Sequence, residues 1–226
     1  MSEPSPSRIV HCQDALAWLG AQSVLEGCSL VSSMPDISEF PNYSLSEWKQ
    51  WFTQTASLIL SKCPDNGVTI FYQSDIKHEG AWVDKGYLCQ KTAESLGHEL
   101  LWHKIACRAP AGTPTFARPS YSHLLCFSKG LRLVDMKLAS ADVMADIGEK
   151  TWQRGMGLKA CLTVAKFIAQ QTSSHTVVNP FCGEGSMLAA ANTLNLNAIG
   201  IERSPKRAEK ARLQRVSPDE QSWELA

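Results

Sequence analysis

The stretch from Val177 to Glu202 restricts the possible folds of this 226-residue chain more than any other. An apolar run at 176–178 leads into a turn with Gly183 and Gly185, an Ala-rich run at 187–194, and a second apolar run at 198–201 that ends at Glu202. This order predicts strand, glycine turn, helix and strand, the repeating unit of a parallel α/β sheet. Glycines in such a turn let the backbone approach a ligand, and an acid at the next strand end can accept both ribose hydroxyls.

This stretch therefore predicts a site for an adenosine-type cofactor. The alternative is an ordinary tight turn followed by a glutamate on the surface. If Gly185 faces the ligand, Gly185→Asp is expected to abolish cofactor binding and to leave the fold intact.

Strand-like and helix-like segments alternate along the rest of the chain, which predicts an α/β fold with a mainly parallel sheet. The predicted strands are 8–12, 28–33, 68–72, 99–107, 122–127, 176–178 and 198–201, and the predicted helices are 15–22, 44–62, 83–96, 158–169, 187–194 and a last one from Ser204-Pro205. No helix separates 99–107 from 122–127, so these two strands are expected to form an antiparallel pair at a sheet edge. Residues 1–7 are predicted to be a disordered tail, 8–216 a single domain and 217–226 a frayed tail.

The composition narrows the function. Lys plus Arg and Asp plus Glu number 22 each, so the formal net charge is zero. This balance excludes a scaffold that holds nucleic acid by bulk positive charge, but it is compatible with a local basic patch. The eight cysteines form no CxxC pair and no zinc-like cluster with histidine, which predicts buried thiols in a reducing cytoplasm and no metal site. No apolar run approaches the about 20 residues of a membrane span.

The glycine turn also separates two classes of cofactor. A dinucleotide site needs a third glycine three residues after the second, and that position is Leu188. By contrast, residues 179–186, read as NPFCGEGS, closely resemble the (D/N)PFCGxG(S/T) motif of S-adenosylmethionine-dependent methyltransferases. The motif is most similar to that of the DNA amino-methyltransferases and their RNA-modifying relatives.

In an unpermuted methyltransferase this motif lies near the start of the domain, whereas here it lies near the end. The resemblance therefore implies a Rossmann-like methyltransferase sheet that is circularly permuted, with residues 8–14, 28–36 and 68–77 as its third, fourth and fifth strands. It also implies contacts to S-adenosylmethionine from the glycine motif, from the ends of two strands and from the segment before the helix at 158–169. These residues are Asp14, Gly155, Met156, Gly157, Asn179, Pro180, Phe181, Gly183, Gly185 and Glu202. Arg154 is expected near the cofactor carboxylate, although 154–157 can also be a simple helix-entry loop.

The catalytic loop departs from the resembled family. There the fourth strand ends in (D/N/S)-P-P-(Y/F/W), which holds an exocyclic amine and stacks the flipped base. Here the chain reads Ser33-Met34-Pro35-Asp36, without the second proline and the aromatic residue. We assign Ser33, Pro35 and Asp36 as candidate catalytic residues. Asp36 can orient or deprotonate another nucleophile, such as a ring nitrogen or a ribose hydroxyl, or it can cap the following turn.

The loop at 108–121 is too short for a recognition domain, which argues against site-specific DNA modification without a partner protein. Basic and aromatic residues near strand ends predict a rim for RNA, with tRNA a plausible substrate. The candidates are Lys77, Lys104, Arg118 and Tyr121. Two alternatives remain open at this point, a methyltransferase of a protein or small molecule and a non-catalytic nucleic-acid-binding subunit that kept the fold.

Overall fold

The computed structural model describes residues 5–116, 118–134, 140–220 and 222–225. Its main sheet contains β1 (Arg8–His11), β2 (Cys28–Ser32), β3 (Thr69–Gln73), β6 (Glu99–Cys107), β7 (Tyr121–Ser128), β8 (Val143–Met144), β9 (Thr176–Asn179) and β10 (Asn197–Ile201). The helices are α1 (Ala15–Gly20), α2 (Leu45–Lys62), α3 (Lys85–Ser95), α4 (Leu158–Gln171), α5 (Ser186–Thr193) and α6 (Pro205–Leu213), with a 3₁₀ turn η1 (Ile37–Glu39).

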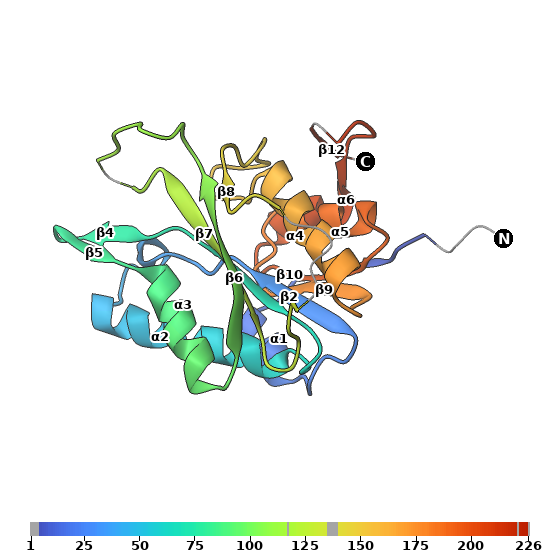
Figure 1. Cartoon of the computed structure of the whole chain (residues 1–226), viewed down its shortest axis with the longest axis horizontal. Coiled ribbons are helices and arrows are strands. Elements are labelled where there is room, and N and C mark those ends of the chain that lie inside the picture. The colour runs from blue at the N-terminus through green and yellow to red at the C-terminus, as the bar shows by residue number, and fades with distance from the viewer. Residues whose placement is uncertain (1–4, 117, 135–139, 221, 226) are drawn as a thin grey trace.

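The strand order of the main sheet is β1-β10-β9-β2-β3-β7-β6-β8. The pairs from β1 to β3 are parallel, while β7 runs antiparallel to both β3 and β6 (Figure 1). The prediction of a mainly parallel sheet with an antiparallel pair toward one edge is confirmed. The start of the chain lies beside its end in this sheet, as the permuted arrangement requires; the permutation itself stays a prediction.

The chain adds strands to the sheet in opposite directions on the two sides of the central strand β9. From β9 the chain passes through α5 to β10 on one side, whereas β2 pairs with the other side of β9 and leads through α2 to β3. Helices consequently leave β9 and β2 in opposite directions, which opens a crevice beyond their carboxyl ends. Ligands of open α/β sheets bind at this position.

Each face of the sheet is covered by its own layer of helices (Figure 1). Apolar residues of α4, α5 and α6 form one buried cluster with the sheet, and those of α1, α2 and α3 form the other. A capping box begins α2, because the Ser44 hydroxyl accepts from the Glu47 amide and the Glu47 carboxylate accepts from the Ser44 amide. These layers hold the strand ends, and therefore the crevice, in place.

Two small hairpins were not predicted. Strands β4 (Ile76–His78) and β5 (Ala81–Val83) pair across a turn in which Glu79 and Gly80 both have positive φ, so α3 begins only after them, capped by Asp84. Strand β12 (Trp223–Leu225), within the residues expected to be a frayed tail, pairs with β11 (Gln214–Val216) at the end of the expected domain. At the other end, residues 1–4 of the predicted tail lie outside the described residues, and Ser7 donates its amide to the Asn197 side chain at 2.8 Å.

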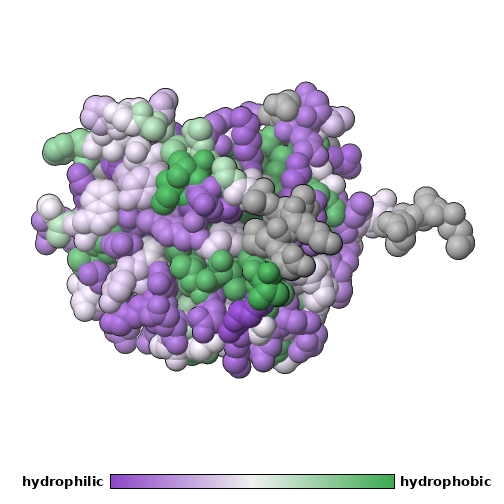
Figure 2. Space-filling view, viewed as in Figure 1, coloured by the Kyte–Doolittle hydropathy of each residue, from purple (hydrophilic) through white to green (hydrophobic). Residues whose placement is uncertain are grey.

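The cysteines are free thiols, and most of them are buried as predicted. Burial raises the pKa of the Cys63 and Cys182 thiols to about 12, so these side chains behave as small apolar residues. Among the described helices, none combines the length and the apolar character needed to cross a membrane. The face in Figure 2 shows hydrophobic side chains interspersed with hydrophilic ones.

Candidate functional site

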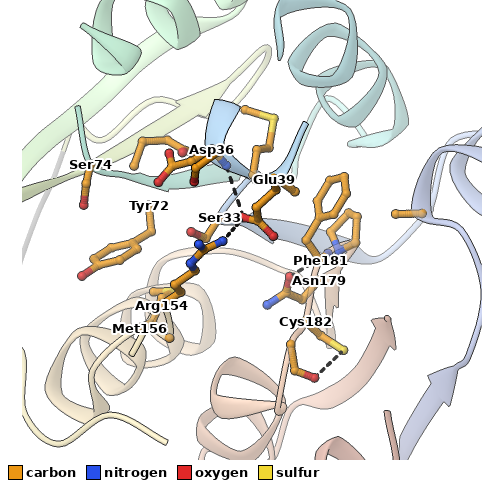
Figure 3. A pocket seen from close by; sticks show the side chains of 18 of the residues that line it. Ser33, Asp36, Glu39, Tyr72, Ser74, Arg154, Met156, Asn179, Phe181 and Cys182 are labelled. Atoms are coloured by element: carbon orange, nitrogen blue, oxygen red, sulfur yellow. Dashed lines mark hydrogen bonds and ion pairs between the residues drawn. The ribbon is translucent and has the colours of Figure 1, made fainter. Parts of the chain in front are cut away.

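A cavity of about 330 Å³ lies at the carboxyl ends of the central strands, within the usual size range of ligand sites. It brings together thirteen of the residues that the sequence singled out: Asp14, Ser33, Pro35, Asp36, Lys77, Arg118, Gly155, Met156, Asn179, Pro180, Phe181, Gly183 and Glu202. Figure 3 shows Ser33 and Asp36, from the segment after β2, and Asn179 and Phe181, from the end of β9, around this space. Gly157, Gly185, Lys104 and Tyr121 do not line it.

Two acids lie at one end of the cavity. Strands β1 and β10 are parallel neighbours with His11 opposite Ile201, so Asp14 and Glu202 follow adjacent strand ends. Glu202 is only 8% exposed, which rules out an ordinary surface glutamate. Its Oε1 accepts from the Ser204 amide at 2.8 Å and from Arg207 Nε at 3.1 Å. Among the described residues no hydrogen bond reaches Oε2, which leaves that oxygen able to accept ligand hydroxyls.

The glycine turn forms the floor beside these acids. Gly183 has a φ of 56°, and a Cβ built there would lie 3.3 Å from Trp152 Nε1. The Trp152 ring also lies under the Arg207 guanidinium, 5.2 Å from its centroid, in a cation–π contact. Trp152 and Arg207 both line the cavity, and the sequence-based predictions missed both. The sequence offered one signal for Trp152, because it is a tryptophan in an otherwise polar segment.

Gly185 has a different role from the one expected. Its φ is 86°, and a Cβ there would lie 2.7 Å from the Ala211 Cα of α6. The prediction that Gly185 faces the ligand was therefore wrong: its missing side chain lets α6 pack against the turn. Gly157, another glycine assigned to the cofactor site, was also misassigned, because it begins α4 with its Cβ position 2.1 Å from the Ile147 carbonyl oxygen.

We expect Gly185→Asp to lower the free energy of unfolding by at least about 2 kcal/mol. The new side chain would overpack against α6, and a residue other than glycine would be strained at this positive φ. Thermal unfolding measures the effect. Gly20→Ala is the matched control, since nothing lies within 4 Å of its Cβ position. An unchanged melting temperature with lost cofactor binding would reinstate the original assignment of Gly185.

The segment before α4 lines the cavity with Arg154, Gly155 and Met156. The Gly155 amide already donates to the Trp152 carbonyl at 3.0 Å. Arg154 Nη1 lies 2.9 Å from Glu39 Oε1, so an ion pair connects this segment with η1, as Figure 3 shows. Buried Met156 and Gly155 line the cavity. Arg154 is therefore engaged by Glu39 in this structure.

The loop at 33–36, which follows β2 and which we call the target loop, places Ser33, Pro35 and Asp36 on the cavity wall. The Asp36 carboxylate forms an ion pair with Lys85 Nζ, and the lysine side chain is only 3% exposed. The Asp36 amide donates to Glu39 Oε1 at 3.4 Å, at the start of η1. Asp36 thus begins the turn with its backbone while its carboxylate faces a buried cation, a partner 49 residues away that the sequence did not reveal.

Asp75, at the end of β3, is the centre of a buried hydrogen-bond network. Its carboxylate accepts from the Lys85 amide at 2.8 Å, from Trp82 Nε1 at 3.2 Å and from His123 Nε2 at 3.0 Å. Burial acts to raise the pKa of Asp75, but the hydrogen bond and charge of His123 outweigh it, and the resulting pKa is below the ordinary value. The network anchors β5 and the start of α3 to the sheet edge.

One group of possible metal ligands occurs among the described residues. Asp75, Asp84 and His123 bring ligand atoms within 4.8 Å of one another. However, Asp84 accepts from the Tyr87 amide as the cap of α3, and Asp75 is already bonded to His123. Hydrogen bonds account for this group, and we assign no metal to it.

Two of the four predicted rim residues do not line the cavity. Lys104 lies three residues before the end of β6, where its Nζ donates to the Ser140 carbonyl and pairs with Asp142 at 3.1 Å. Tyr121 begins β7 but packs edge-on against the His123 ring, 5.3 Å between centroids. The assignment of buried Lys104 as a substrate contact was therefore wrong, since this side chain serves the structure of the sheet edge, while that of half-buried Tyr121 stays a prediction.

The remaining rim is basic and aromatic. Lys77 Nζ lies 5.6 Å from the ring centroids of both Trp82 and Phe116, which are 47% and 93% exposed. The cavity is lined by eight Lys and Arg residues against five Asp and Glu residues, although the chain as a whole is neutral. Burial, followed by the charge of Arg108, lowers the pKa of Lys150 on this wall. The site therefore favours an anionic ligand with flat rings.

The sequence matches no protein-family model and no curated protein. Solved structures do match. TTHA0409 of Thermus thermophilus, named as a candidate DNA modification methylase and complexed with S-adenosyl-L-methionine, has a TM-score of 0.70 at 16% identity, over 90% of this chain and 91% of that one. PvuII DNA methyltransferase, cytosine-N4-specific, gives 0.69 at 16% identity over 92% and 86%. The M1.HpyAVI–SAM complex gives 0.61 at 14% identity over 91% and 98%.

These likenesses extend over almost the whole of each chain. They confirm the fold that the motif resemblance implied: the chain has the fold of the S-adenosylmethionine-dependent methyltransferases.

Proposed function

We propose that this chain is an S-adenosylmethionine-dependent methyltransferase that acts on a base of nucleic acid. The observation that carries the proposal is the two-ended cavity. One end has the glycine turn and Glu202, suited to an adenosine, and the other has the target loop beneath a basic and aromatic rim. A methyl donor and a nucleobase could therefore meet inside one cavity.

The residues at the first end fit the cofactor. The volume of about 330 Å³ suits a ligand of nucleoside size, and Gly183 leaves the floor open where a side chain would intrude. Glu202 Oε2 would accept ribose hydroxyls, while Asp14 would lie beside the adenine. When bound, S-adenosylmethionine supplies an electrophilic methyl group on its sulfonium. Phe181 and Met156 would exclude water from the reacting atoms.

The target loop would supply the chemistry at the second end. Ser33 and Asp36 reach the cavity from the end of β2, next to the glycine motif that follows β9. Asp36 would accept a proton from the nucleophile, and Ser33 would hydrogen-bond the base. Pro35 would shape the loop rather than contact the substrate, because its carbonyl oxygen accepts from Trp48 Nε1 at 3.4 Å.

The rim would hold the nucleic acid. Lys77, Arg108 and Arg118 line the cavity without an acidic partner among the described residues, and they would contact phosphates. Exposed Phe116 and Trp82 would stack unpaired bases, as aromatic side chains do in single-strand binding sites.

RNA was the predicted substrate because basic and aromatic residues lie near the strand ends and the loop at 108–121 is too short for a recognition domain. The comparisons do not support RNA over DNA, because two neighbours described as a DNA modification methylase and a DNA methyltransferase match over 91% and 86% of their own lengths. We therefore propose nucleic acid as the substrate class and leave RNA and DNA as separate arms of the test.

The test has two stages. S-adenosylhomocysteine should raise the melting temperature of the purified chain, because a ligand stabilises the folded state that binds it. Methyl-labelled cofactor should then transfer label to RNA or DNA from total extracts and not to protein. Stabilisation with label only in protein would contradict the substrate class. Absence of both effects would contradict the proposed function as a whole.

We expect Phe116→Ala to weaken binding of single-stranded nucleic acid, because base stacking on an aromatic ring contributes about 1–3 kcal/mol. The melting temperature should not change, since Phe116 is 93% exposed. Fluorescence anisotropy with a labelled oligonucleotide measures the affinity. Tyr87→Ala is the control: this tyrosine is 59% exposed, but its ring lies beside Lys91, whereas the Phe116 ring lies beside the cavity-lining Lys77. Equal affinities for both variants would remove Phe116 from the site.

A further inference from the structure

We infer that the target is a base with a carbonyl group next to a ring N–H, as in uracil, thymine or guanine, and that the ring nitrogen receives the methyl group. This inference rests on the proposed function. It comes from the hydrogen-bonding groups that surround the target loop, which suit a lactam edge better than an exocyclic amine.

An exocyclic amine brings two N–H donors and needs acceptors. Two acceptors of this loop are already used. The Pro35 carbonyl accepts from Trp48 Nε1, and the Asp36 carboxylate is paired with Lys85 through Oδ1. The second Asp36 oxygen and the Ser33 hydroxyl oxygen remain as acceptors in this loop, so the choice between the two kinds of substrate depends on the donors that lie beside them.

Lys85 supplies donors in the same place. It lines the cavity, is 2% exposed, and has Asp36 as the only hydrogen-bond partner of its ammonium among the described residues. An ammonium has three N–H donors, so two of them have no described acceptor. Buried donors without acceptors are costly, and a carbonyl oxygen of the substrate would complete this site.

Gln73 independently indicates a missing ligand. It ends β3, lines the cavity and is 1% exposed, and neither its amide oxygen nor its amide nitrogen has a hydrogen-bond partner among the described residues. A buried amide with both ends unsatisfied is unusual. One donor and one acceptor on a planar amide match the donor and acceptor of a base edge.

Together these groups complement a lactam. The base carbonyl would accept from Lys85, and the adjacent ring N–H would donate to the free oxygen of Asp36. In the reaction the N–H proton moves to Asp36. The nitrogen lone pair forms the bond to the methyl carbon as the carbon–sulfur bond breaks, leaving a thioether. Lys85 stabilises the negative charge that develops on the carbonyl oxygen.

Uracil and cytosine test this directly, because they have the same ring but differ at positions 3 and 4, where uracil has N–H and C=O and cytosine has N and NH₂. In the presence of S-adenosylhomocysteine, we expect the protein to bind single-stranded oligo(U) at least about 10-fold more tightly than oligo(C), since a hydrogen-bonding site rejects the mismatched edge. Mass spectrometry of nucleosides from methylated total RNA and DNA should find the label on ring nitrogens of lactam bases.

Lys85→Met should remove the preference, Lys85→Arg should keep it, and Lys91→Met, an exposed lysine on the same helix, should change nothing. Lys85→Arg keeps the test valid if Lys85→Met does not fold. Methylated exocyclic amines, or equal binding of the two oligomers, would overturn the inference and leave the proposed function standing. Loss of cofactor binding and of all methyl transfer would overturn both.

Discussion

Asp36→Asn is expected to lower kcat by about 10²- to 10⁴-fold, the usual effect of removing a group that takes a proton in the transition state. The affinity for S-adenosylhomocysteine should stay unchanged, because Asp36 lies at the target end of the cavity and not at the Glu202 end. Single-turnover methyl transfer and calorimetric titration measure the two quantities on one preparation. A fall in affinity equal to the fall in rate would contradict the catalytic assignment.

The structure adds a complication, because Asp36 also neutralises buried Lys85. Removing one partner of a buried ion pair is destabilising, although the 23% exposure of the Asp36 side chain moderates the loss. The double variant Asp36→Asn with Lys85→Met removes both charges, so it should recover stability without recovering activity. If activity returns with stability, Asp36 is structural.

The chain provides a matched pair for comparison. Lys104 is also a buried lysine paired with an aspartate, Asp142, but neither residue lines the cavity. Asp142→Asn should therefore leave kcat unchanged. If Asp36→Asn and Asp142→Asn lose activity to a similar extent, then breaking either lysine–aspartate ion pair lowers activity by destabilising the fold.

The glycine motif shows what the sequence could predict and what it could not. Strand, turn and helix are local, so the position of the motif followed from residues 176–202 alone. The direction in which each glycine faces depends on what packs there. Ala211 of α6 lies against Gly185, and Trp152 lies against Gly183. These neighbours come from other parts of the chain, so the sequence assigned one role to both glycines.

For the same reason, the sequence could not predict the neighbours of two rim residues and of Asp36. Lys104 and Tyr121 have the expected residue types, but the register of β6 and β7 directs them to partners within the sheet edge. The partner of Asp36 comes from α3, 49 residues later. A local motif can place a carboxylate on a loop, whereas its charge environment depends on contacts that the motif does not contain.

Glu202→Gln is expected to weaken cofactor binding by about 10- to 100-fold. A hydrogen bond to a charged group contributes about 1.5–3 kcal/mol, and the amide cannot accept two ribose hydroxyls as the carboxylate can. The substitution keeps the shape of the side chain, so the change in affinity reports the charge and the lone pairs. Titration calorimetry with S-adenosylhomocysteine measures it.

Glu184 is the control that separates binding from stability. Like Glu202, it is a nearly buried acid paired with a basic residue of α6, since its Oε1 lies 2.7 Å from Lys210 Nζ, but it does not line the cavity. Glu184→Gln should therefore lower the melting temperature about as much as Glu202→Gln and leave cofactor affinity unchanged. If both variants lose affinity equally, the acids act by anchoring α6 to the glycine turn, and the nucleoside end of the cavity is wrongly placed.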